Sequence, residues 1–149
     1  MPRIALVTYS GLPELTDDDR PLISALRERG FEALPVAWDA PTDWSQFDQI
    51  IFRSCWDYHL RITEFLEWIR KLDSLAVSVQ NSSNLVCWNA DKRYLKQLQA
   101  AGAQIPPTVW IDEEKEASVH DIIDSRGWTS AVVKPTVFQR PPLKTGLQR

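Results

Sequence analysis

Two lysines stand where an ammonium group could hold phosphate oxygens. Lys92 follows Asn89-Ala90-Asp91 at the predicted start of a helix, and a helix N-terminus attracts anions. Lys134 ends the apolar segment 130–134, a predicted strand from which a compact positive charge could face a cleft. Each lysine also has a simpler interpretation, because Lys92 could be a solvated surface side chain and Lys134 an edge lysine that prevents sheet pairing.

The sequence lacks the motifs of several other kinds of functional site. The loop after the first predicted strand reads Ser10-Gly11-Leu12-Pro13, which has too few glycines for a backbone that approaches a dinucleotide. Neither the phosphate-binding P-loop motif nor the nucleophile-elbow motif occurs. His59 and His120 are far apart, and Cys55 and Cys87 lack metal or redox spacing. We therefore expect no metal site, no dinucleotide site and two free thiols.

Composition and charge narrow the class of protein. The chain has 149 residues, of which 44% are apolar and 25% charged, as in an ordinary globular protein of roughly one domain. Its net charge of -3 disfavours a nucleic-acid surface, which needs concentrated positive charge. No apolar run approaches the roughly 18 residues of a membrane span. These features predict a cytoplasmic protein that binds neither nucleic acid nor membrane.

The hydrophobic pattern predicts an α/β fold. Apolar, β-favouring runs alternate with helical patterns, which favours an open, mostly parallel sheet with helices on its faces. Pro35 places the second strand at an edge, because proline cannot donate a hydrogen bond to a neighbour. The predicted strands are residues 4–9, 32–38, 48–53 and 76–80, and the predicted helices lie in 16–30, 59–72 and 89–102.

A second region follows Ile105-Pro106-Pro107, since two consecutive prolines resist continuing a helix. Beyond them, the sequence predicts a strand at 108–111, a helix near 117–126 and a strand at 130–134. The last residues show neither strand alternation nor a helical stripe, and they carry Arg140, Lys144 and Arg149 without an acid. The sequence thus predicts one α/β domain, part of a second, and an irregular end.

Three segments in this order resemble an ATP-grasp ligase of the glutathione-synthetase-like kind. They are Trp88-Asn89-Ala90-Asp91-Lys92, Ala101-Gly102-Ala103-Gln104-Ile105-Pro106-Pro107-Thr108 and Val132-Val133-Lys134-Pro135. Two amino-terminal segments are similar to the Rossmann-like α/β domain that precedes the ATP-grasp fold; they read VTYSGLPELTDDDRPL and FRSCWDYHL. The resemblance implies that Lys92 and Lys134 contact the phosphates of ATP. It also implies a pre-ATP-grasp domain at 1–104, an incomplete nucleotide-binding part at 105–135 and a tail at 136–149.

The loop after the third predicted strand is the candidate substrate site. In the family, loops of the pre-ATP-grasp domain lie beside the ligase cleft, and ligands of open α/β sheets generally bind beyond the carboxyl ends of strands. An arginine there could clamp a carboxylate through two hydrogen bonds. The simpler alternative is that Arg53 pairs with Asp57 while Trp56 only packs. The candidate residues are Arg53, Ser54, Trp56, Asp57 and Tyr58.

The resemblance also implies an activity. ATP-grasp ligases use ATP and Mg²⁺ to convert a small carboxylic acid into an acyl phosphate, which an amine, thiol or hydroxyl then attacks. In the family, the small-residue loop, adenine hinge and metal ligands follow the strand that ends at Lys134, whereas here only residues 136–149 follow.

These final residues suggest a truncated ligase. The codons possible for Phe138 to Pro142, read two bases later, can encode the family's Ser-Ala-Ser-Ala loop, so we hypothesise a reading-frame shift near residue 137 and a non-native tail. The chain alone is then expected to be inactive and to bind ATP weakly or not at all. The alternative is a stand-alone, non-catalytic α/β module that binds a small molecule or a partner. A phosphoacceptor receiver domain is disfavoured, since the third strand leads into Arg53-Ser54 and not an aspartate.

Overall fold

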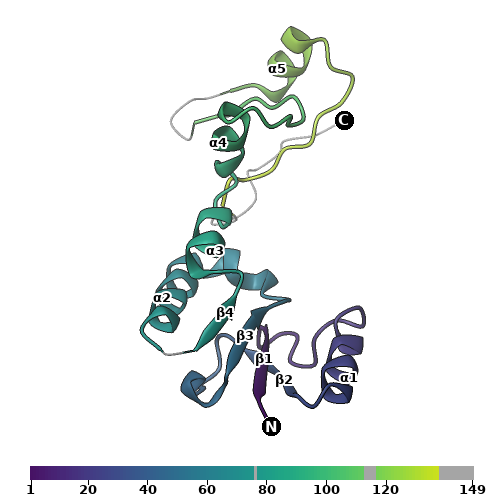
Figure 1. Ribbon diagram of the computed structural model, residues 1–149. Coiled ribbons are helices and arrows are strands. Elements are labelled where there is room, and N and C mark those ends of the chain that lie inside the picture. Colours follow the sequence, from purple (N-terminus) through teal and green to yellow (C-terminus); the bar gives the residue numbers. More distant parts are fainter. Residues whose placement is uncertain (76, 113–116, 138–149) are drawn as a thin grey trace. The chain divides into compact units, whose positions relative to one another are not determined.

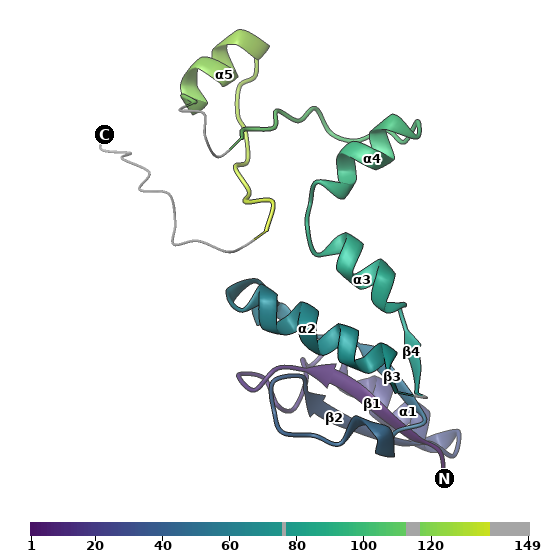
Figure 2. The same cartoon turned by 90° about the vertical axis from the view of Figure 1, so that its left-hand side faces the viewer.

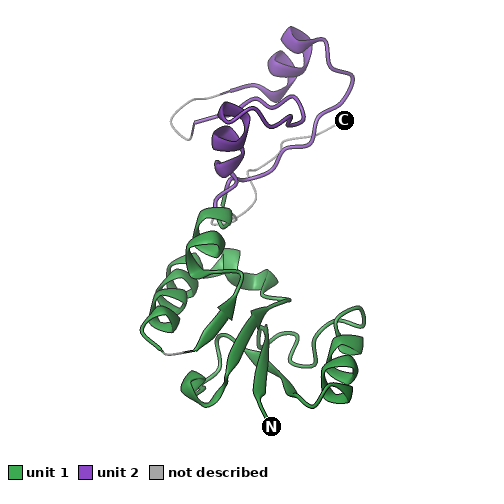
Figure 3. Cartoon of the chain, in the orientation of Figure 1, with its two compact units in different colours: residues 1–90, 137–149 green, residues 91–136 purple. Residues whose placement is uncertain are grey.

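The computed structural model describes residues 1–75, 77–112 and 117–137 of the chain. It divides into two compact units, which are coloured separately in Figure 3. Unit 1 is described by residues 1–75, 77–90 and 137, and unit 2 by residues 91–112 and 117–136. No helix among these residues has the length and apolar character needed to cross a bilayer. The predicted boundary near residue 104 lies within unit 2 and stays a prediction.

Unit 1 is built on a four-stranded parallel sheet. Its strands are β1 (Arg3–Thr8), β2 (Glu32–Ala37), β3 (Gln49–Phe52) and β4 (Ser78–Gln80), in the spatial order β2-β1-β3-β4. Ile4 of β1 is paired with Ala33 of β2 and with Gln49 of β3, which sets the register. The predicted edge position of the proline-bearing strand is confirmed, because in the described residues β2 is hydrogen-bonded to β1 and to no other strand.

Helices cover both faces of this sheet, as the sequence predicted. Helix α1 (Arg20–Glu28) and helix α2 (Ile62–Asp73) lie on opposite faces (Figure 1 and Figure 2). Short 3-10 turns occupy Trp44–Gln46 (η1) and Trp56–Leu60 (η2). The N-cap of α1 is Asp19, and Pro21 lies in its first turn, where a proline is tolerated; the helix lies within the predicted range 16–30.

The core follows from the alternation of side chains along β1. Ile4 and Leu6 face α1 and pack with the fully buried Leu15, whereas Ala5 and Val7 face α2. The α2 side is rich in aromatic rings, and the rings of Trp38 and Trp44 both contact Trp68 of α2, with centroids 5.9 and 5.1 Å apart. Since both faces are buried, β1 reads as a continuous apolar run.

The helix predicted at 89–102 begins later than expected, and a helix before it was not predicted. The structure has α3 (Ser83–Asn89) in unit 1, where it packs against α2, and α4 (Tyr94–Ala100) in unit 2. The predicted helix start at Asn89 is therefore wrong, because Asn89 ends α3 and α4 begins at Tyr94. The carboxylate of Asp91 accepts a hydrogen bond of 2.9 Å from the Arg93 backbone N–H and pairs with the Arg93 guanidinium. This local turn competes with helix formation between the two segments.

Unit 2 differs from the sequence prediction in its strands. The predicted helix is present as α5 (Val119–Arg126), but the segments 108–111 and 130–134 are not strands. Val132 and Val133 are 80% and 56% exposed, so the segment 130–134 contacts little of the described chain. A strand needs a hydrogen-bonding neighbour, and the described residues of unit 2 provide none to these segments.

Candidate functional site

The strand order marks one place in unit 1 where a ligand is expected. The chain passes from β1 through α1 to β2 on one side, and then returns past β1 to β3 on the other side. The loops that follow β1 and β3 therefore leave the sheet in opposite directions. Ligands of open parallel sheets bind at such a reversal, beyond the carboxyl ends of the strands. Here those loops are residues 9–19 and 53–61.

Three side chains join the two loops. Asp19, at the end of the first loop, is only 7% exposed. Its Oδ1 accepts a hydrogen bond of 2.9 Å from Nε of Arg53 and a second from Nη2 of the same guanidinium, while its Oδ2 accepts one from the buried Ser54 hydroxyl. Burial opposes ionisation of Asp19, but the hydrogen bonds from Ser54, Arg53 and Thr16 outweigh it and lower its pKa.

The Arg53 guanidinium keeps one edge available. Asp19 occupies the edge formed by Nε and Nη2, and no acceptor among the described residues contacts Nη1 of Arg53. The side chain is 42% exposed, so the edge formed by Nη1 and Nη2 is open to a ligand. The backbone beneath it is fixed, because the N–H groups of Arg53 and Ser54 both donate to the carbonyl of Val7 on β1, at 3.1 and 3.0 Å.

A second arginine at this end of the sheet, Arg61, pairs with two carboxylates. The Arg61 Nη2 donates to Asp39 at 2.6 Å and to Asp57 at 2.8 Å, and its guanidinium carbon lies 4.6 Å from the centre of the Trp38 ring. Asp39 also accepts the backbone N–H of Ser10 at 2.8 Å. Burial opposes ionisation of Asp39, but these hydrogen bonds outweigh it and lower its pKa. The Arg61 cluster therefore ties together the loops that follow β1, β2 and β3.

The alternative pairing of Arg53 with Asp57 is wrong. Arg53 pairs with Asp19, whereas the carboxylate of Asp57 accepts hydrogen bonds from Nε1 of Trp38 at 2.8 Å and from Arg61. Trp56 is 60% exposed, and its role stays a prediction. The structure brings the five predicted residues into one segment at the carboxyl end of the sheet, and this agrees with their expected location without testing their role.

Tyr58 and Cys55 have clear structural environments. The Tyr58 ring is half-buried and packs on Phe65 of α2, with centroids 5.3 Å apart. The Cys55 thiol is buried and lies 3.7 Å from the Val7 carbonyl. Burial raises the pKa of Cys55 to about 12, so its reactive thiolate is scarce at neutral pH. Both cysteines are free thiols, as the sequence predicted.

Sequence reasoning missed three members of this site. Asp19, Asp39 and Arg61 were not identified as candidate site residues. Two signals were present in the sequence, because Asp39 follows the second strand and Arg61 lies four residues after Asp57. What the sequence did not show was that Asp19 would reach Arg53, from which it is 34 residues distant.

In unit 2, the segments that carry the two predicted nucleotide lysines are neighbours. The backbone N–H of Lys92 donates to the carbonyl of Thr136 at 2.9 Å, two residues beyond Lys134. The local environments differ from the prediction, because Lys92 precedes α4 and Lys134 is exposed on a segment that is not a strand. The ammonium group of Lys96 lies 5.0 Å from the centre of the Trp110 ring. Whether Lys92 and Lys134 contact a nucleotide stays a prediction.

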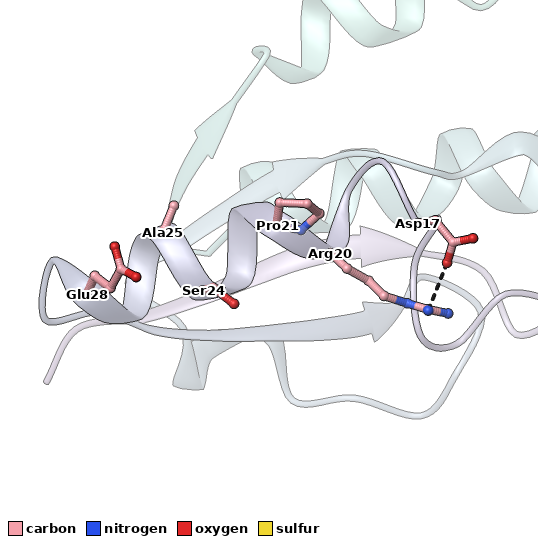
Figure 4. A pocket seen from close by; sticks show the side chains of 6 residues that line it. All are labelled: Asp17, Arg20, Pro21, Ser24, Ala25 and Glu28. Carbon is pink, nitrogen blue, oxygen red and sulfur yellow. Dashed lines mark ion pairs between the residues drawn. The ribbon is translucent and has the colours of Figure 1, made fainter.

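A shallow hollow on α1 is separate from the predicted site residues. It is lined mainly by exposed polar side chains (Figure 4), and the Asp17 carboxylate pairs with Arg20 there at 2.8 Å. No three His, Cys, Asp or Glu side chains gather as a metal site in the described parts of the chain. The residues that line the hollow are Asp17, Arg20, Pro21, Ser24, Ala25 and Glu28.

Comparison with known proteins gives consistent matches. A family profile described as D-cycloserine synthetase DcsG, N-terminal domain, matches residues 4–81, slightly more than half of the chain. The cycloserine biosynthesis protein DcsG of Streptomyces lavendulae is 34% identical over 137 residues, covering 89% of this chain and 46% of that protein. The chain therefore spans less than half the length of this relative.

Two solved structures are similar. The crystal structure of D-cycloserine synthetase DcsG aligns with a TM-score of 0.72 and 32% identity, over 84% of this chain and 43% of that one. A RimK domain protein ATP-grasp from Sphaerobacter thermophilus aligns with a TM-score of 0.48 and 23% identity, over 70% of this chain and 40% of that one. Together with the family match, the likeness to DcsG confirms the predicted resemblance to the amino-terminal portion of an ATP-grasp-related ligase.

Proposed function

The chain belongs to the family of DcsG N-terminal domains, and on that premise we propose that unit 1 holds a substrate of an ATP-dependent carboxylate ligase. This substrate is the small carboxylic acid, which we call the acceptor. The reaction we assign to the intact protein activates a small carboxylic acid as an acyl phosphate, which an amine, thiol or hydroxyl then attacks. ATP and Mg²⁺ are the cofactors that intact ATP-grasp enzymes use. A relative named D-cycloserine synthetase is in keeping with a small substrate.

The open edge of the Arg53 guanidinium carries this proposal. It lies at the reversal of strand order, and its two N–H groups can bind both oxygens of a carboxylate. Trp56, 60% exposed and three residues further on, offers a flat apolar surface to the rest of the substrate.

The other three candidate residues act as supports in this proposal. The Ser54 hydroxyl and the Asp57 carboxylate are already engaged, with Asp19 and with Trp38 and Arg61, while the Tyr58 ring packs on Phe65. We therefore assign direct substrate contact to Arg53 and Trp56, and assign to Ser54, Asp57 and Tyr58 the role of holding the loop.

For the nucleotide, we propose that Lys92 and Lys134 contact phosphate oxygens. The hydrogen bond between Lys92 and Thr136 keeps their two segments adjacent, so both ammonium groups can serve one polyphosphate. The residues described here do not fit the Mg²⁺ of the family, since no group of three carboxylate, histidine or cysteine side chains gathers among them. Phosphate contacts without metal ligands supply only part of an affinity, so we expect weak ATP binding by residues 1–149.

A chimeric enzyme tests the substrate role. Residues 1–90 of this chain would replace the aligned region of the Streptomyces lavendulae protein, and ADP release would be measured as the acceptor and ATP concentrations vary. We expect Arg53→Ala to raise the KM for the acceptor at least tenfold and to leave the KM for ATP within twofold, because the lost contact is to the acceptor carboxylate. Arg27→Ala, which removes an exposed arginine of α1, is the matched control.

Two results would decide against this assignment. An acceptor KM in the Arg53→Ala chimera equal to that of Arg27→Ala would remove Arg53 from the substrate site. If the 149-residue chain binds small acids tightly while an active chimera shows no dependence on Arg53, the stand-alone binding module becomes the better interpretation.

A further inference from the structure

We propose that Asp19 is a positioning residue, which holds the Arg53 guanidinium so that its open edge receives the substrate carboxylate. The inference rests on the proposed function, because Arg53 is there the group that touches substrate. Asp19 belongs to the loop after β1 and Arg53 to the loop after β3, so their contact spans the reversal of strand order.

The geometry of the contact distinguishes positioning from a simple ion pair. A carboxylate that pairs fully with arginine uses both oxygens on two parallel N–H groups. Here Oδ1 of Asp19 accepts both contacts from Arg53, while Oδ2 accepts the Ser54 hydroxyl. The guanidinium is therefore held along one edge, and the edge bearing Nη1 stays open.

Burial of Asp19 makes the arrangement rigid. The Asp19 side chain is 9% exposed, whereas the Arg53 side chain is 42% exposed, so the anchor is inside the protein and the anchored group reaches solvent. The Asp19 backbone N–H also donates to the Thr16 hydroxyl at 3.1 Å, and the nearby Leu15 is fully buried. A guanidinium held in this way loses less side-chain freedom when it binds a carboxylate than a freely rotating one.

Arg61 provides an internal comparison within the same part of the fold. Its guanidinium contacts both Asp39 and Asp57 and stacks on Trp38, so its positive charge is already matched by two carboxylates. Within the described part of the chain, Arg53 contacts one carboxylate, that of Asp19. The positive charge of Arg61 is balanced by more carboxylates than that of Arg53, so a carboxylate in solution should bind Arg53 in preference to Arg61.

The test is an NMR titration of the 149-residue chain with acetate as the carboxylate probe and acetamide as its neutral counterpart. The Nε–H signals of Arg53 and Arg61 would be followed in one sample. In the unmodified chain, we expect acetate to shift the Arg53 signal in a saturable way and to leave Arg61 unchanged, with no response to acetamide. We expect Asp19→Asn to weaken acetate binding at Arg53 about tenfold and to speed hydrogen exchange at its Nε–H.

A double-mutant cycle separates positioning from general stability. If Asp19 acts through Arg53, Asp19→Asn weakens acetate binding in the otherwise unmodified chain but has no further effect when Arg53 is already alanine. In the Arg53→Ala background, any residual acetate binding is measured from backbone amide shifts. Should Asp19→Asn fail to fold by circular dichroism, Ser54→Ala takes its place, because it removes only the hydroxyl bond to Oδ2. We expect about threefold weaker acetate binding for that variant.

The titration separates a failure of the proposed function from a failure of the positioning role alone. Absence of any acetate shift at Arg53 in the unmodified chain would contradict the carboxylate role in the proposed function, and the positioning role with it. An acetate shift that keeps the same affinity in Asp19→Asn, or in Ser54→Ala where that variant is used, would overturn the positioning role alone and leave the proposed function standing.

Discussion

Removing Arg61 should destabilise unit 1 in a way that depends on pH. In Arg61→Ala, the carboxylates of Asp39 and Asp57 lose their shared partner although their side chains are only 10% and 12% exposed. A hydrogen bond to a charged group contributes about 1.5–3 kcal/mol when buried. Because the Arg61 side chain is 36% exposed, solvent screening reduces each of its two bonds to about 1 kcal/mol.

The stacking of Arg61 on Trp38 adds to this loss. A cation over an aromatic ring contributes about 0.5–1 kcal/mol at an exposed site. The expected decrease in the free energy of unfolding at pH 7 is therefore about 2–3 kcal/mol. For a domain of this size, each 1 kcal/mol lowers Tm by about 4–8 °C, so we expect a decrease in Tm of roughly 10–20 °C.

The pH dependence follows from the lowered pKa of Asp39 in the folded protein. A carboxyl whose pKa is lower in the folded than in the unfolded state stabilises the fold above its unfolded pKa, about 3.9. That contribution is lost as the pH falls through the folded pKa. The difference between the unmodified chain and Arg61→Ala should therefore be full at pH 7 and shrink below about pH 4.

Urea unfolding monitored by tryptophan fluorescence, at pH values from 3 to 7, measures both effects. Arg27→Ala is the matched control, because it removes an exposed arginine of α1 and should change stability by less than about 0.5 kcal/mol. An Arg61→Ala variant as stable as this control at pH 7 would refute the reasoning. So would a stability difference that stays constant down to pH 3, since the ionisation of Asp39 would then play no part.

Two further predictions concern the core and the thiols. Ile69→Ala truncates a fully buried side chain of α2, so it should lower the free energy of unfolding in urea by about 2–5 kcal/mol. Leu60→Ala, at a side chain 71% exposed, should lower it by less than about 0.5 kcal/mol. Equal losses would contradict the assigned core. Burial raises the pKa of Cys55 to about 12, so iodoacetamide at pH 8 should modify the less buried Cys87 well before Cys55. Mass spectrometry of peptides measures the two rates. Faster modification of Cys55 would contradict its buried position.

The sequence was most informative where a local pattern and the tertiary structure agree. The apolar run of β1 reads as a doubly covered strand because both of its faces are buried, and Pro35 indicated an edge strand because it lacks an N–H. The helical stripe of α2 has the same origin, since Phe65, Ile69 and Leu72 lie on the face that packs on the sheet. Such patterns depend on neighbours in sequence and can be read without the fold.

Local pattern was insufficient in unit 2. The segments 108–111 and 130–134 have strand-like composition, but a strand also requires a hydrogen-bonding partner, and sequence composition does not supply one. The predicted helix opening at Asn89 was also wrong, because the side chain of Asp91 forms a turn with Arg93 between α3 and α4. Propensity describes what a segment can form, whereas its surroundings decide what it does form.

For the candidate site, the sequence by itself determined the residue types and their position after a strand. Arg53 could be selected because it follows an apolar strand in a parallel sheet, where side chains at the carboxyl ends meet a ligand. Only the tertiary structure decided its partner. Asp19, 34 residues earlier, reaches Arg53 because the order β2-β1-β3 places the loops after β1 and β3 side by side. Pairing between distant residues depends on strand order, which a single sequence does not encode in any local pattern.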